Sequence, residues 1–413
     1  MREGMESIRK HKWTVLGIVA YALFMDYFIY GLVVPLSPYS PAKITSESQM
    51  GMLYAAYALG VLLATPVFGH LGDKLGCRRP MIIGVVLSGI ATLLFCFANS
   101  FFLALAARLS QGAAAAATWT AGLALVAGNY SDKRVQMMGL VLVGSTAGSV
   151  LGPVAGGWLY EQGGYQFPFL ITAAMVLLDA LMRTCFLSAD SKPAESAHTE
   201  NNFLIPLLTD KSVLVAGLAV ALAAAGFGIV EPILPNHLRQ AGIAPAQVGV
   251  LFTSSTIVYG LSAPLVEWVS EKFSIKNTIV FGIVAMAAVL PLLALSSDYV
   301  LTALCLAAVN VSYAFMLNPS SAELGNAVDR RGLNCYAAVY AIYNITYSLG
   351  MIGVDAFASA ASEKFSLLQI FGSMSLVLLF SIPFVLKALG SGSQVITKST
   401  IGDSGVQGES PSG

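Results

Sequence analysis

The chain has 413 residues, of which 56% are hydrophobic and only 11% are charged, and its formal net charge is zero. A soluble domain carries about 25% charged residues, so most of the exterior of this chain must face an apolar medium. Zero net charge argues against a nucleic acid partner, and the five cysteines lack metal-ligand spacing, so we predict neither a metal site nor a disulfide framework.

Apolar runs long enough to cross a bilayer recur along the whole chain, because a membrane helix needs about 20 such residues. The twelve runs lie near residues 13–36, 49–70, 80–98, 101–128, 135–158, 166–187, 212–235, 248–269, 277–296, 299–321, 333–357 and 366–388. The first is too long for a signal-peptide core and is predicted to be a retained helix. The sequence therefore predicts an all-α membrane protein with twelve transmembrane helices.

The connections between these runs predict the domain organisation. A polar connection, 188–211, separates a six-helix bundle at 13–187 from a second at 212–388. Lys and Arg gather in alternate loops, which the positive-inside rule assigns to the cytoplasm. Residues 1–12, the linker and both termini are therefore expected to be cytoplasmic. Residues 389–413 are rich in Gly and Ser, which predicts a disordered tail.

An internal repeat relates the two bundles. Residues 31–38 read GLVVPLSP and residues 228–235 read GIVEPILP, and in the following helices Pro66 matches Pro264. The offset stays at 197 or 198 residues throughout. Two pseudo-symmetric halves are the arrangement expected for alternating access around a site near the middle of the membrane.

Two acidic residues lie deep within apolar runs. Asp26 is about 20 Å along the first helix at 1.5 Å per residue, and Glu231 is followed by Pro232 in the outer half of the seventh. Desolvation disfavours the charged form of such an acid, so each can carry a proton in one state and bind a cation in another. Alternatively, each is a neutral acid that donates a structural hydrogen bond. Three further acids lie nearer the cytoplasmic helix ends, where solvation is the alternative to a role inside the membrane: Asp179, Glu267 and Glu323.

The loop after the second run, residues 69–79, reads GHLGDKLGCRR. It resembles the signature loop of the major facilitator superfamily, in which Asp73, Gly76, Arg78 and Arg79 occupy the motif positions. The resemblance implies the twelve-helix major facilitator fold and a role for these residues in conformational gating. The alternative is a basic loop that only obeys the charge rule.

The fourth run contains Arg108 in the segment RLSQG, which resembles the Arg-x-x-Gln-Gly motif of the same superfamily. An arginine inside a membrane helix is costly and must face a partner or water. One interpretation is a charge that tunes a proton-carrying acid. The other is a side chain that reaches the interface near the outer end of the helix.

The fifth run has glycine at every fourth position from 144 to 156 and ends in GPVAGG. Small residues at this spacing form a smooth face for close helix packing. The segment resembles the antiporter signature of proton-coupled drug exporters. This resemblance implies a gating role for Gly152, Pro153, Gly156 and Gly157.

The eleventh run carries Tyr336, Tyr340, Tyr343 and Tyr347 on one face, with Asn344 one turn from Tyr340. Tyrosine hydroxyls at membrane depth need partners, so this face is predicted to line a polar cavity. Tyrosine rings also attract organic cations. Ordinary packing of an aromatic stripe is the alternative.

Taken together, residues 13 to about 385 resemble the drug:proton antiporter family, and within it the vesicular amine transporters and their bacterial relatives. The resemblance implies that Asp26 and Glu231 are the acids that bind substrate and protons. It also implies that Tyr54, Tyr259 and Tyr347 are aromatic residues of the substrate cavity.

The chain departs from these relatives at several positions. Asn344 stands where the vesicular proteins carry an acid, Asn318 lies near another such position, and Tyr57 replaces a lysine. Asp355 occupies a position where relatives usually have a proline. These differences leave the number of transported protons and the amine specificity open.

We predict a proton-coupled antiporter that exports organic amines or amphipathic cations by alternating access. It is expected to be a monomeric multi-pass protein of the plasma (inner) membrane that interacts with protons and lipid, has no cofactor and is not an enzyme. The alternative is proton-coupled or facilitated transport of a neutral metabolite such as a sugar or siderophore. The residues predicted to bind substrate are Asp26, Tyr54, Glu231, Tyr259, Asn318, Tyr340, Tyr343, Asn344 and Tyr347, and those predicted to couple protons are Asp26, Arg108 and Glu231.

Overall fold

The computed structural model describes residues 12–42, 44, 46–129, 134–187, 210–296, 298–330, 336–362 and 364–388. The predicted N-terminal segment, linker and tail lie outside these residues, apart from Lys12, Asp210 and Lys211. Inside some helices the side chains are also outside the description, among them those of Asp73 and Tyr340. Predictions that depend on these segments and side chains stay predictions.

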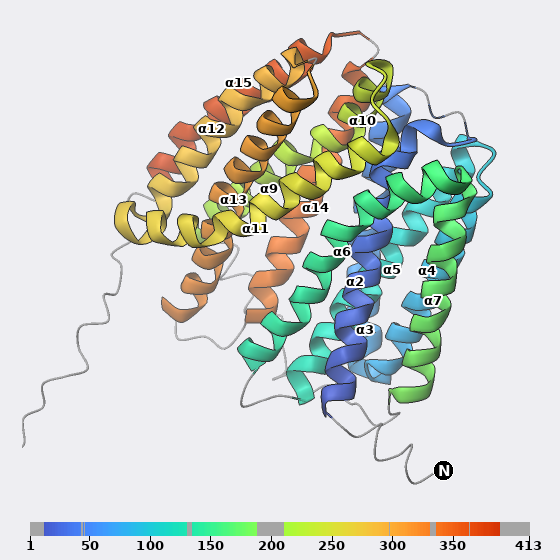
Figure 1. Ribbon diagram of the computed structural model, residues 1–413. Helices are drawn as coiled ribbons and strands as arrows, with labels where there is room; N and C mark the ends of the chain where they lie inside the picture. The colour runs from blue at the N-terminus through green and yellow to red at the C-terminus, as the bar shows by residue number, and fades with distance from the viewer. Residues whose placement is uncertain are drawn as a thin grey trace, which may run out of the picture.

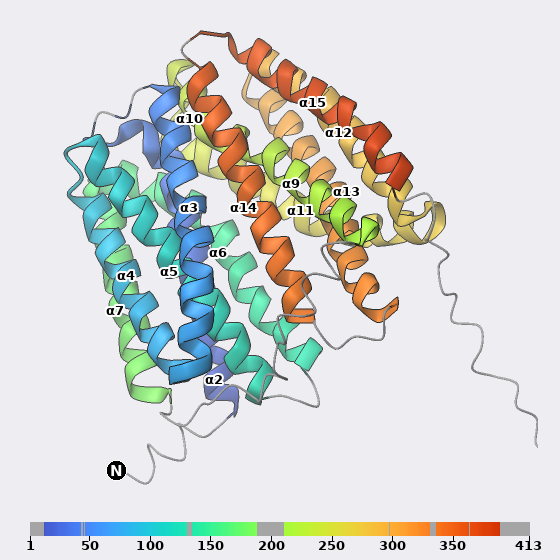
Figure 2. The same cartoon turned by 180° about the vertical axis from the view of Figure 1, so that it is seen from behind.

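The described chain consists of helices, with no strand in these residues (Figures 1 and 2). The first half contains α2 (Lys12–Leu36), α3 (Glu47–Leu75), α4 (Arg78–Cys96), α5 (Phe101–Asn129), α6 (Arg134–Gly163) and α7 (Gln166–Phe186). The second contains α9 (Lys211–Gly228), α10 (Val230–Gln240), α11 (Pro245–Phe273), α12 (Ile275–Leu295), α13 (Tyr299–Arg330), α14 (Tyr336–Ala361) and α15 (Leu367–Ala388).

These helices confirm the predicted twelve spans. By length and hydropathy, 10 stretches of the described residues can cross a membrane, and α9 and α10 together form one of them. The other two spans are α5, with 29 residues, and α14, with 26. Both are longer than the roughly 20 residues that a bilayer requires.

The seventh span is broken where its first-half counterpart is continuous. α9 ends at Gly228 and α10 begins at Val230. The ring of Pro232 removes a hydrogen-bond donor and collides with the carbonyl four residues earlier, which belongs to Gly228. α2 instead runs through Pro35 and ends one residue later. The repeat is thus imperfect at the place where only the second copy carries an acid, Glu231.

α13 extends nine residues beyond the predicted boundary at 321, to Arg330. The added segment is polar, which is why its composition predicts a loop. The Arg330 side chain donates to a Glu323 carboxylate oxygen at 2.8 Å, and Glu323 is only 2% exposed. The alternative that Glu323 is solvated is therefore wrong, because the lengthened helix places a basic partner two turns further on.

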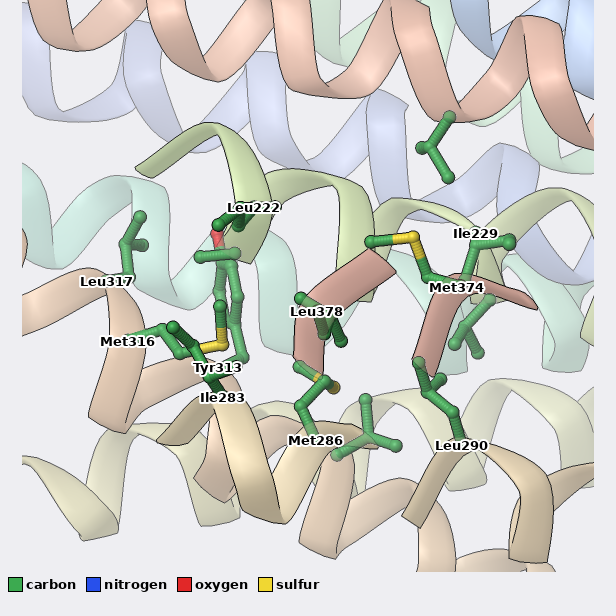
Figure 3. Packing of buried hydrophobic residues seen from close by; sticks show 14 of the residues in the cluster. Leu222, Ile229, Ile283, Met286, Leu290, Tyr313, Met316, Leu317, Met374 and Leu378 are labelled. Carbon is green, nitrogen blue, oxygen red and sulfur yellow. The ribbon is translucent and has the colours of Figure 1, made fainter. Parts of the chain in front are cut away.

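Each half packs mainly on itself, and its outward surface is apolar. In the second half Leu222 of α9, Ile283 and Met286 of α12, Met316 of α13 and Met374 of α15 share one core (Figure 3). Large apolar side chains point outward from the peripheral helices: Leu177 of α7, Phe281 of α12 and Phe380 of α15 are 62%, 57% and 74% exposed. Such a surface is suited to lipid rather than to water.

The halves meet mainly through two helix pairs, α3 with α14 and α6 with α11, and α10 adds contacts to α2 and α3. At the second pair the Thr253 hydroxyl donates to the carbonyl of Val150 at 2.6 Å. At the first pair the hydroxyls of Ser48 and Ser359 are 3.0 Å apart. Ser48 is at the start of α3 and Ser359 is near the end of α14, and α10 lies beside these helix ends (Figure 2). We call this end of the molecule the α10 end. The two halves are closed against each other there.

Candidate functional site

The glycine row of α6 holds α2 at the centre of the first half. A methyl group added to Gly152 would lie 2.6 Å from the carbonyl oxygen of Phe28, and one added to Gly156 would lie 2.7 Å from that of Leu32. Gly144 and Gly148 approach the backbone of α2 still more closely. The predicted packing face is therefore present, and it sets the position of the helix that carries Asp26.

The end of the same motif faces the other half. Gly157 packs against the backbone of Pro245 and Ala246 at the start of α11, while Gly249 of α11 packs against the Pro153 carbonyl. The motif thus joins the support of α2 to the contact between halves. The gating role of its residues remains a prediction.

Glu231 lies at the contact between the two halves. It is in the first turn of α10, immediately after the break in the seventh span, and is 6% exposed. Its carboxylate accepts a short hydrogen bond from the hydroxyl of Tyr30, which belongs to α2 of the other half. The two interpretations of Glu231, as a proton-carrying acid and as a neutral acid in a structural hydrogen bond, both stay predictions.

Arg108 lies behind Tyr30, inside a cage of aromatic rings. Its guanidinium carbon is 5.1 Å from the ring centre of Tyr30, 4.7 Å from Tyr54, 5.8 Å from Tyr57 and 5.6 Å from Phe95. The side chain is completely buried. The interpretation of Arg108 as an interface-reaching side chain is therefore wrong, and the rings stabilise its charge through cation–π contacts.

The polar groups in this cage are only partly paired. Arg108 donates one hydrogen bond to the side-chain oxygen of Gln111 at 2.9 Å. In the part of the chain that the structure describes, the Nε and Nη2 atoms of Arg108, the Gln111 amide nitrogen and the Tyr54 hydroxyl have no hydrogen-bond partner. The unpaired N–H and O–H groups in the cage can therefore donate hydrogen bonds to another polar group.

Asp26 belongs to a second charged cluster, on the first-half side. It is 9% exposed, and Trp119 of α5 donates to it at 2.9 Å. The positive charge of Arg183 in α7 also acts on Asp26. Arg183 in turn is paired with Asp179 at 2.5 Å and donates to Thr118 at 3.2 Å.

One prediction about this second cluster needs correction. Asp179 is not solvated: its side chain is 1% exposed, and that of Arg183 is 2% exposed. The i, i+4 spacing places them on one face of α7, where each neutralises the other. By contrast, Glu267 in α11 is exposed.

The predicted tyrosines of the second half form a hydrogen-bonded group. Tyr259 of α11 donates to the Asn318 side chain of α13 at 3.0 Å. Tyr313 of α13 donates to the hydroxyl of Tyr347 of α14 at 3.1 Å, and the ring centres of Tyr343 and Tyr347 are 6.1 Å apart. The structure thus brings Tyr259, Asn318, Tyr343 and Tyr347 together, as the sequence predicts.

Other predicted residues lie apart from this group. Asn344 is exposed. In the signature loop, Gly76 has a φ of 78° and Arg78 donates to the carbonyl of Thr184 at 3.0 Å, whereas Arg79 is exposed. Glycine tolerates such a positive φ, so Gly76 can end α3 in a tight turn.

Sequence reasoning missed several residues of the site, among them Tyr30, Trp119 and Tyr313. It also gave no role to Asp355, which is completely buried and without a hydrogen-bond partner in the described chain. The spacing of Tyr30 four residues after Asp26 could have indicated a shared helix face. Nothing in the sequence links Tyr30 to Glu231, because the two residues come from different halves.

Comparison with known proteins shows the family to which the chain belongs. The family model of the Major Facilitator Superfamily matches residues 17–218 and 216–399. The chromaffin granule amine transporter of Rattus norvegicus is 31% identical over 307 residues, which are 73% of this chain and 58% of that protein. The synaptic vesicular amine transporter of Mus musculus is 29% identical, over 77% of this chain and 62% of that protein. The chain thus spans about three fifths of the length of these relatives.

Solved structures share the fold. A crystal structure of the nucleoside transporter NupG matches with a TM-score of 0.73 at 15% identity, over 92% of this chain and 99% of that one. A bacterial homologue of the human lysosomal transporter Spinster matches with a TM-score of 0.71, also at 15% identity, over 92% of this chain and 97% of that one. With its twelve spans and two-half architecture, the chain belongs to the Major Facilitator Superfamily and is a multi-pass membrane transporter related to the vesicular amine transporters.

Proposed function

We propose that this transporter exchanges protons for organic amines or amphipathic cations, and that Glu231 is the carboxylate for which substrate and proton compete. The observation that carries this proposal is the hydrogen bond from Tyr30 to Glu231, which joins the two halves at a buried acid. When the Glu231 carboxylate gains or loses a proton, its hydrogen bond to the other half is altered at the same time. This is the property that coupling requires.

The exchange follows from the two charge states of Glu231. When ionised, the carboxylate attracts an ammonium group and accepts the hydrogen bond from Tyr30. When protonated, it loses the Coulomb attraction for a cation. Because one carboxylate cannot hold a proton and an ammonium ion equally well, binding of either favours release of the other. Arg108 lies against the ring of Tyr30, and its positive charge acts on this carboxylate.

Asp26 is suited to act as a second cation-binding acid. Apart from Trp119, no hydrogen-bond partner of its carboxylate is found in the described chain, and no arginine of that part contacts it directly. Tyr27, the next residue of α2, is 37% exposed although it lies in the middle of the span. We propose that this part of α2 faces the path of water and substrate.

The tyrosines around Tyr347 supply the apolar and aromatic part of the proposed substrate site. Organic cations bind well over tyrosine rings. The names of the relatives, which refer to amine transport, favour an amine over other cations. We further propose that the protein is a monomer of the plasma (inner) membrane with both termini in the cytoplasm, so that the closed α10 end faces outward.

Transport by reconstituted protein tests the proposal. Liposomes with an acid interior are supplied with a labelled monoamine, with and without a proton ionophore. We expect ionophore-sensitive uptake by the wild type that is lost in Glu231→Gln and strongly reduced in Asp26→Asn. Glu267→Gln is the matched control, because it removes the same charge from an exposed position of α11. It should transport like the wild type.

Two results would oppose the proposal in different ways. Coupled amine uptake that survives in both Glu231→Gln and Asp26→Asn would exclude competition at these acids. Folded wild-type protein that takes up no amine under any gradient would favour the alternative substrate class, a neutral metabolite.

A further inference from the structure

Asp355 differs from the other buried acids of the described chain. Glu231, Asp26, Asp179 and Glu323 each have a side-chain hydrogen-bond donor. Asp355 is completely buried, and neither of its carboxylate oxygens has a partner in the part of the chain that the structure describes. Burial of a charged carboxylate without any donor is strongly unfavourable.

Asp355 lies on α14 at the contact with α3, where the two halves are closed. A methyl group added to Gly51 of α3 would lie 2.5 Å from the backbone oxygen of Asp355 and 2.9 Å from the backbone nitrogen of Ser359. One turn further along, Ser359 and Ser48 are 3.0 Å apart through their hydroxyls. The two helices are thus in backbone contact at Asp355, and its side chain is completely buried in this closed arrangement.

Four charged or titratable groups interact with Asp355, and they come from α10, α5, α3 and α14 itself. Glu231 of α10 and Arg108 of α5 act on it through their charges, and Asp355 acts in turn on Tyr54 of α3 and Tyr347 of α14. Arg108 makes its one hydrogen bond to Gln111 and no ion pair with Asp355. Glu231 has the same sign of charge. The surroundings therefore do not neutralise an ionised Asp355 by direct contact.

We propose that Asp355 is a second proton-binding acid of the transport cycle, which takes up a proton when α3 and α14 are apart and must hold it for these helices to close. The step is a simple transfer: the carboxylate accepts one proton from the solution at the open α10 end and becomes a neutral carboxyl. Reopening of this end returns it to water, where it can ionise. Because the proton is taken from and returned to the same end, Asp355 controls closure of that end and does not itself carry protons across the membrane. Its place in a transport cycle rests on the proposed function, but its effect on closure does not depend on any substrate.

The direct test measures closure without substrate. Spin labels are attached at Asn99→Cys and Lys364→Cys, two exposed positions in opposite halves at the α10 end, in a background without other cysteines. The distance between the labels is followed from about pH 5 to about pH 9. Each proton taken up on closure changes the ratio of closed to open protein by up to about tenfold per pH unit. In the wild type, we expect the open population to grow as the pH rises.

Asp355→Asn should remain closed to a higher pH than the wild type. Its ratio of closed to open protein should change less with pH, by up to about tenfold less per pH unit. Ser359→Ala is the matched control: it loosens the same contact but binds no proton, so it should open more at every pH with the wild-type pH dependence. If Asp355→Asn does not fold, Asp355→Ala provides a second residue that cannot ionise.

An unchanged pH dependence in the folded Asp355 variant, both alone and combined with Glu231→Gln, would overturn the proposal. Failure of the proposed function is a separate result. If wild-type protein transports no amine, the distance measurement still decides whether Asp355 binds the closing proton.

Discussion

Replacement of Gly152 by alanine is expected to destabilise the first half by forcing α2 away from α6. The new methyl group would lie 2.6 Å from the carbonyl oxygen of Phe28, which is about 0.8 Å short of ordinary van der Waals contact. The backbone nitrogen of Leu32, at 3.1 Å, and the Cα of Gly31, at 3.2 Å, are also close. All three atoms belong to backbone, so no side chain can rotate away. Overpacking of this kind costs roughly 1–3 kcal/mol.

The measurement is the thermal unfolding of purified protein in detergent, together with gradient-driven transport. Gly353→Ala is the matched control, because Gly353 lies in α14, is exposed, and has no atom within 4 Å of the added methyl group. Alanine there should be neutral or stabilise by about 0.5–1 kcal/mol, since glycine is the poorer helix former. If Gly152→Ala unfolds at the same temperature as Gly353→Ala, the glycine row does not hold α2 in the way described.

Three further changes test the charged clusters. Tyr30→Phe keeps the ring beside Arg108 but removes the hydrogen-bond donor to Glu231. We expect amine exchange to slow by roughly 10- to 100-fold, because a hydrogen bond to a charged group contributes about 1.5–3 kcal/mol. An exchange rate equal to that of the wild type would show that this bond is dispensable. Arg108→Lys should fold less stably, as judged by thermal unfolding, because a compact ammonium cannot stack on several rings as a guanidinium does; equal stability would argue against the cage. Arg183→Gln should lower the free energy of unfolding by about 3–5 kcal/mol, because it leaves Asp179 charged and buried. Addition of Asp179→Asn should recover much of this loss. Losses that add up in the double variant would contradict the pairing of these two residues.

The number, order and approximate limits of the helices could be predicted from composition, because lipid requires long apolar runs whatever the tertiary contacts. The limits were missed where local composition misleads. The polar end of α13 remains helical with the help of the bond from Arg330 to Glu323. The break between α9 and α10 was signalled by Pro232, but its position at Gly228 follows from the carbonyl with which the ring collides.

The site was only partly predictable. Asp26, Glu231 and Arg108 attract notice because charges within apolar runs are rare. Their partners come from helices that are distant in the sequence, so the bond between Tyr30 and Glu231 and the cage around Arg108 cannot be read from spacing. For Asp355, it is the absence of a partner in the described chain that could not be predicted. A sequence reveals an acid in an apolar run, but only the packing of α3 against α14 reveals that the acid has no partner in the described chain.

Competition between proton and amine at Glu231 can be measured without a membrane gradient. A monoamine is added to purified protein in weakly buffered solution, amine binding is followed by calorimetry, and released protons are followed with a pH indicator. If the two ligands share this carboxylate, the wild type and the Glu267→Gln control should release protons as amine binds, and Glu231→Gln should release fewer. Amine binding with no proton release, or with equal release from Glu231→Gln, would contradict exchange at this acid.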